Sequence, residues 1–120
     1  MIEIFLSLAA VVQQPATPPE EAAPPALSIS AQAGVRCAAA FALVSYEQAN
    51  GGPAAEKWPA IDPRGREYFV RTMARVMDET GMDREATAEL ARLEAQRLIE
   101  ANEVDAVMPA CLALLDASGI

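Results

Sequence analysis

Alanine is the feature that most constrains this fold: it fills 26 of the 120 positions, whereas Val and Ile together fill 14. Alanine has the highest helix propensity, and the β-branched residues that favour strands are few. A methyl side chain buries little area, so the core between such helices is thin and a chain of this length gains from a covalent cross-link. The composition therefore predicts one small, all-α domain.

The first of four predicted helices covers about residues 29–50. Ser28 or Ser30 is a suitable N-cap, and a glycine pair follows the last turn. Apolar side chains lie on two nearly opposite sides of this helix, which is typical of a helix at the centre of a bundle. One side has Cys37, Phe41 and Val44, and the other has Val35, Ala39, Ala42 and Tyr46. The proline-containing loop that comes next holds Trp58, which we expect to fold back over the core.

The other three helices follow one another through short connections, so we expect antiparallel neighbours in a four-helix bundle. An Asp precedes each of them as a suitable N-cap. The predicted ranges are 63–80 after Asp62, 84–102 after Asp83 and 106–118 after Asp105. The residues expected to face the core are Phe69, Val70, Met73, Val76 and Met77 on the second helix, Ala86, Leu90, Leu93 and Ala101 on the third, and Val107, Met108, Cys111, Leu114 and Leu115 on the fourth.

The chain contains two cysteines, Cys37 and Cys111, each at the centre of the apolar face of its predicted helix. Their wide spacing excludes a C-x-x-C redox motif, and two thiolates without histidine make a poor zinc site. They are either two separate buried thiols or one disulfide between the first and last helices. An even count in a small exported domain favours the disulfide, so this prediction depends on export.

The N-terminal composition differs from that of the remaining chain. The apolar run Ile4–Val12 resembles the core and cleavage region of a secretory signal, although Glu3 stands where a basic residue is usual, and the run is too short to span a bilayer. Five prolines follow it, which predicts an extended linker. We expect a periplasmic or secreted protein, with a cytoplasmic one as the alternative. The predicted segments are a signal peptide at 1–12, a disordered linker at 13–26 and a helical domain at 27–120.

Several kinds of chemistry are excluded or disfavoured by composition. Histidine is absent, which removes the usual general base near neutral pH and the commonest metal ligand. A net charge of −8 is unsuited to binding a phosphate backbone, so nucleic acid is not an expected partner. Neither a glycine-rich phosphate loop nor an EF-hand spacing is present. We therefore predict no enzyme activity, no metal site, no cofactor and no transmembrane segment.

Two groups of arginines are candidate binding residues. Arg64, Arg71 and Arg75 share one side of the second helix, where they form either a face for an anionic partner or an ion-paired, solvated face. Arg97 interrupts the apolar stripe of the third helix. It is expected either to extend its charged end into water or to form a buried ion pair with a carboxylate of another helix.

The function predicted first is that of an exported, periplasmic accessory protein that acts by binding another protein. One alternative is a periplasmic stress chaperone or a small-ligand carrier, which would need a cavity near Met73, Met77 and Met108. Another is a cytosolic helical regulator with free thiols. The absence of catalytic groups and the export-like N-terminus favour the first of these predictions.

Overall fold

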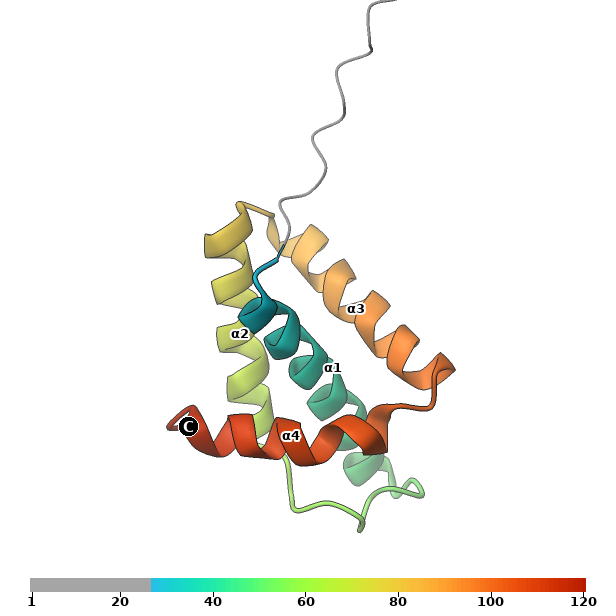
Figure 1. Ribbon diagram of the computed structural model, residues 1–120. Helices are drawn as coiled ribbons and strands as arrows, with labels where there is room; N and C mark the ends of the chain where they lie inside the picture. The colour runs from blue at the N-terminus through green and yellow to red at the C-terminus, as the bar shows by residue number, and fades with distance from the viewer. Residues whose placement is uncertain (1–26) are drawn as a thin grey trace, which may run out of the picture.

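The computed structural model describes residues 27–120, and these residues form four α-helices without a strand (Figure 1). The predicted all-α fold with four helices is thereby confirmed. The predicted signal peptide at 1–12 and linker at 13–26 lie outside the described residues. The helices are α1 (Ile29–Asn50), α2 (Arg64–Thr80), α3 (Arg84–Glu100) and α4 (Val104–Ala117).

Helix α1 is the centre of the fold, and α2, α3 and α4 all pack against it. Its two-sided apolar pattern predicted this position. The predicted chain of antiparallel neighbours is wrong at the last step, because α3 and α4 barely touch. Helix α4 instead crosses the end of the bundle in front of α1 (Figure 1). The chain turns there at Asn102, which has a left-handed φ of 54°.

Small residues allow α1 to lie close to its neighbours. Gly34, Ala38, Ala39 and Ala40 are all buried on α1. At Gly34 a Cβ atom would lie 3.2 Å from the Thr72 methyl group of α2, so the two helices meet with almost no side chain between them. The alanine-rich sequence therefore gives a thin core through close backbone approach and few large side chains.

Helix α3 is rotated about its axis relative to the prediction, so that the buried face is shifted by about one residue along the sequence. The residues it buries are Thr87, Ala91 and Leu98, whereas Leu93 is half exposed. The prediction placed the larger leucines inward, but α3 packs against α1, and Ala91 clusters there with Val35 and Ala38. The Thr87 hydroxyl is satisfied locally, because it donates to the Asp83 carbonyl at 2.7 Å.

The predicted N-caps are right at two helices and wrong at two. Ser28 Oγ accepts from Ala31 N at 3.1 Å, and Asp83 Oδ1 accepts from Ala86 N at 2.8 Å. Asp62 does not cap α2, because its carboxylate accepts from Ser45 Oγ and the Gly65 amide bonds to a backbone carbonyl. Asp105 lies inside the first turn of α4, which begins at Val104.

The core side chains form two clusters, one on each side of α1. Phe41 stands in the larger cluster, with its ring 5.3 Å from that of Tyr68 in an edge-on arrangement. Trp58 folds back from its loop and packs against the same cluster, as its sequence position predicts. Met73 and Met108 are buried in the core.

Candidate functional site

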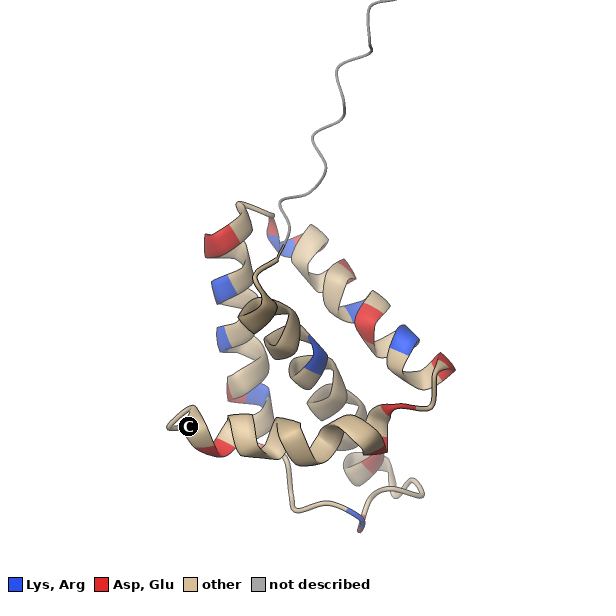
Figure 2. Cartoon of the chain, viewed as in Figure 1, with Lys and Arg blue, Asp and Glu red and all other residues tan. Residues whose placement is uncertain are grey.

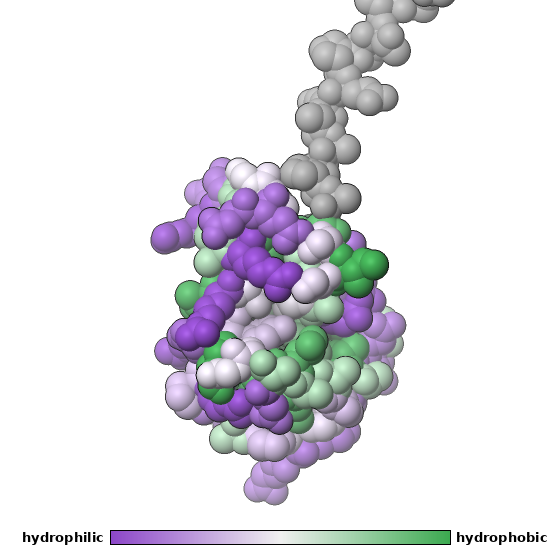
Figure 3. Space-filling model, turned by 60° about the vertical axis from the view of Figure 1, so that its left-hand side comes forward, coloured by the Kyte–Doolittle hydropathy of each residue, from purple (hydrophilic) through white to green (hydrophobic). Residues whose placement is uncertain are grey.

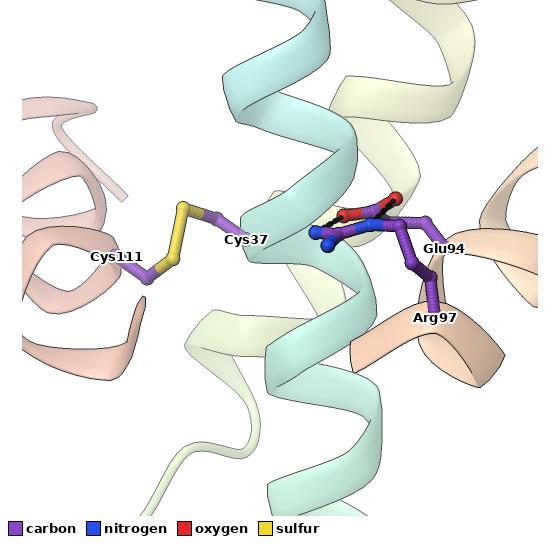
Figure 4. Close-up of a disulfide and its surroundings, with 4 residues drawn as sticks. All are labelled: Cys37, Glu94, Arg97 and Cys111. Carbon is purple, nitrogen blue, oxygen red and sulfur yellow. Dashed lines mark hydrogen bonds and ion pairs between the residues drawn. A yellow bond between two sulfur atoms is a disulfide. The ribbon is translucent and has the colours of Figure 1, made fainter. Parts of the chain in front are cut away.

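Cys37 and Cys111 lie at disulfide distance, with their Cα atoms 5.1 Å apart, and Figure 4 shows their sulfur atoms joined between α1 and α4. Both residues are almost fully buried. This geometry is the one expected of a structural cross-link, because a Cα separation near 5.5 Å suits a disulfide. A catalytic thiol would instead need exposure to solvent.

A mostly apolar groove of about 570 Å³, here named the corner groove, lies between the end of α1, the loop after it, the end of α3 and the start of α4. Its volume lies in the range of ligand and peptide sites. Sequence reasoning did not identify it, because four separate chain segments form it. Its lining residues are Leu43, Val44, Tyr46, Glu47, Pro53, Ala54, Lys57, Leu98, Ile99, Asn102, Val104 and Asp105.

Two large apolar side chains of the corner groove are exposed to water. The Tyr46 residue is 70% exposed and Ile99 is 59% exposed. Tyr46 was expected on an inward face of the first helix, and it is instead at the rim of the groove. Exposed aromatic and aliphatic residues around a concave apolar surface are typical of protein-binding sites.

An ion pair lies on the edge of the corner groove. The Lys57 ammonium group donates to the Asp105 carboxylate, and this hydrogen bond lowers the pKa of Asp105. The pair connects the loop before α2 to the first turn of α4. Glu47 also lines the groove, and its carboxylate accepts from the Ala54 amide at 3.1 Å. The polar edge is therefore made of partnered groups.

Arg64, Arg71 and Arg75 all belong to α2, and Figure 2 shows basic positions along this helix. Each has a partner within the chain. Arg64 donates to Asp116 at 3.1 Å and to the Ile120 carbonyl at 2.9 Å, Arg71 donates to Glu67 at 2.9 Å, and Arg75 donates to Ser30 Oγ at 2.6 Å. Figure 3, turned toward this side, shows hydrophilic surface beside an apolar area.

Arg97 forms an ion pair at the surface, so of its two expected arrangements the structure shows the one with the charged end in water. Its side chain is 47% exposed, because α3 directs Leu98 and not Arg97 into the core. Arg97 donates to both oxygens of Glu94, at 2.7 and 3.0 Å, and to Glu103 at 3.0 Å. These two carboxylates raise its pKa further above the ordinary arginine value. Figure 4 shows Arg97 and Glu94 reaching from α3 toward α1.

A second depression of about 580 Å³, here named the front groove, lies between the first half of α1, α3 and the start of α4. It is more polar than the corner groove. Its lining residues are Leu27, Gln32, Val35, Arg36, Leu90, Leu93, Glu94, Arg97, Glu103 and Val107.

Within residues 27–120 there is no group of three or more His, Cys, Asp or Glu side chains that could hold a metal ion. In the same part of the chain, no helix combines the length and apolar character needed to cross a membrane. No protein-family model matches the chain, and neither the curated proteins nor the solved structures contain a significant match. The arrangement of its own residues is therefore the basis for any functional proposal.

Proposed function

We propose that this chain is an exported accessory protein that binds an apolar segment of another protein in the corner groove. The observation that carries the proposal is the exposure of Tyr46 and Ile99 beside a 570 Å³ apolar depression. Large apolar side chains left in water at a concave surface lower the free energy of binding when a partner covers them.

A Cys37–Cys111 disulfide formed on export supports this function. The corner groove needs α1 and α4 at a fixed distance, and the disulfide would link these two helices directly. A groove held in its binding conformation loses less conformational entropy when the partner arrives. Disulfides persist in oxidising compartments, which agrees with the signal-like N-terminus.

The partner segment is expected to combine an apolar anchor with a basic flank. The charged residues that line the groove are Glu47, Lys57 and Asp105, and the chain as a whole carries a net charge of −8. The field around the groove is therefore negative, which attracts basic segments and speeds their association at low salt.

Site-specific photo-crosslinking in the native host tests the proposal. A photoreactive phenylalanine analogue at Tyr46 is expected to form a discrete adduct with one partner. The matched control is the same analogue at Val70, which is 57% exposed on α2 and lines neither groove. The absence of an adduct at Tyr46, or equal adducts at both positions, would count decisively against a binding site in the corner groove.

A charge substitution gives a second, independent measurement. Ile99→Glu places a carboxylate at the rim of the groove, where the apolar contact would be desolvated on binding. The partner is expected to be lost from co-purification, while the exposed position keeps the fold intact. The corresponding change at Leu114, 42% exposed on α4 and outside the groove, is expected to retain the partner.

A further inference from the structure

We propose that the front groove binds a small amphiphilic carboxylate, with its apolar chain between α1 and α3 and its carboxylate on Arg36. This site is separate from the corner groove: the two depressions share no lining residue. The inference therefore does not depend on the proposed protein partner.

The apolar part of the groove comes from three helices. Val35 of α1 is buried, and Leu90 and Leu93 of α3 and Val107 of α4 line the groove with it. Leu93 is 50% exposed in this position because α3 is rotated away from its expected orientation. A hydrocarbon chain that covered these side chains would remove their apolar surface from water.

The two arginines that line the groove, Arg97 and Arg36, differ in their hydrogen bonding. Arg97 already occupies the carboxylates of Glu94 and Glu103 through three N–H donors. Arg36 is exposed at the same groove and makes no hydrogen bond or ion pair with another described residue. An anionic ligand would thus meet guanidinium donors that no residue of 27–120 occupies, whereas a cationic ligand would have to displace Arg97 from its carboxylates.

The geometry of a guanidinium favours a carboxylate as the polar end. Its planar N–H groups bind both oxygens of a carboxylate in parallel, and such charge-assisted pairs are stronger than neutral hydrogen bonds. The groove, at about 580 Å³, is within the size range of small-molecule sites, so it accommodates a medium-length acyl chain. A saturated ten-carbon carboxylate, decanoate, is therefore a suitable probe.

Calorimetric titration of the oxidised protein with decanoate, below the concentration at which it forms micelles, tests the proposal. Saturable one-to-one binding is expected. Decanol and decyltrimethylammonium, which keep the chain but replace the anion by a neutral or a cationic group, are expected to bind about tenfold more weakly or worse. Equal or tighter binding of either analogue would overturn the assignment to Arg36.

Two variants locate the site. Arg36→Gln is expected to weaken decanoate binding at least about tenfold, because it removes the charge-assisted hydrogen bonds. Arg84→Gln is the matched control: it removes the same charge from an exposed position on α3 that does not line the groove, and it is expected to leave the affinity unchanged. Leu93→Ala, at a half-exposed position, tests the apolar wall and is also expected to weaken binding.

The absence of decanoate binding to the wild-type protein overturns the inference, and so does an equal loss in the Arg36 and Arg84 variants. Neither result bears on the corner groove, because photo-crosslinking at Tyr46 is measured without the probe. Conversely, failure to cross-link a partner at Tyr46 leaves the decanoate titration unaffected. The two proposals are thus tested by separate measurements at separate residues.

Discussion

At the scale of single residues, two buried glycines make the close helix contacts possible. Replacing each by alanine is expected to change the free energy of unfolding by a different amount. A Cβ at Gly65 would overlap the Cγ2 atom of Ile61 and lie 3.4 Å from the Phe41 Cβ. Gly65→Ala is therefore expected to destabilise the protein by about 1–3 kcal/mol through overpacking. Urea unfolding followed by circular dichroism measures this change.

Gly34→Ala is the matched control for that prediction. Its Cβ would lie 3.2 Å from the Thr72 methyl group, a tight contact that requires a small shift, and alanine gains about 1 kcal/mol of helix propensity inside α1. The two contributions nearly cancel, so the unfolding midpoint is expected to change little. A larger loss at Gly34 than at Gly65 would contradict this account of the helix contacts.

The ionisation of Tyr68 is expected to lower the stability of the fold at alkaline pH. Burial raises the pKa of its hydroxyl above the ordinary value of 10.0, while Arg75 and a hydrogen bond to Thr72 act in the opposite direction. Because the folded state holds the proton more tightly than the unfolded state, the stabilisation is complete below pH 10 and is lost as pH rises through the folded pKa.

The measurement for this prediction is the unfolding free energy as a function of pH. Tyr68→Phe keeps the ring against Phe41 but cannot ionise, so its stability is expected to fall less steeply than that of the wild type above pH 10. Identical slopes for the two proteins would show that Tyr68 ionisation is not coupled to folding.

At the scale of the elements, the existence of the four helices could be predicted, but the rotation of α3 could not. Helix propensity, Gly and Pro positions and the caps at Ser28 and Asp83 are local signals. The orientation of α3 depends on the small residues of α1 that it meets, which lie about 50 residues earlier in the chain. Choosing the larger apolar residues as the buried ones fails when the facing surface is made of alanine and glycine.

The rotation of α3 makes a prediction about two leucines of equal size. Leu98 is fully buried and Leu93 is half exposed. Leu98→Ala is expected to cost about 2–5 kcal/mol, because it leaves a cavity in the core, and Leu93→Ala is expected to cost less than about 1 kcal/mol. Denaturant unfolding of both variants checks this order, and a reversed order would restore the orientation expected from the sequence.

At the scale of the whole molecule, the two grooves illustrate why the candidate sites were beyond sequence reasoning. The sequence singled out arginines on one helix face, and the structure gives each of them an internal partner. The grooves arise where three or four segments meet. There is space for them because α3 and α4 barely touch. Tyr46 and Ile99 carried no local signal of this site. Helical periodicity shows which apolar residues share a face, but it does not show whether another element covers that face.

The largest effect on stability that we predict for the whole molecule is that of the cross-link between Cys37 and Cys111. A bond across 74 residues removes much of the conformational entropy of the unfolded chain, which corresponds to about 4 kcal/mol in the chain-entropy model. Such a contribution is comparable to the whole stability of a small domain with a thin core. The double variant Cys37→Ala, Cys111→Ala is therefore expected to unfold at much lower urea than the oxidised wild type.

Reduction of the wild type is the control for this experiment, because it breaks the bond without changing the sequence. The reduced wild type and the double variant are expected to unfold together, well below the oxidised protein. Intact mass after thiol alkylation, with and without reduction, shows which form the native host produces. A chain that takes two alkyl groups without reduction would establish free thiols and favour the cytosolic regulator. The proposed groove would then lack the cross-link that holds α1 and α4 together.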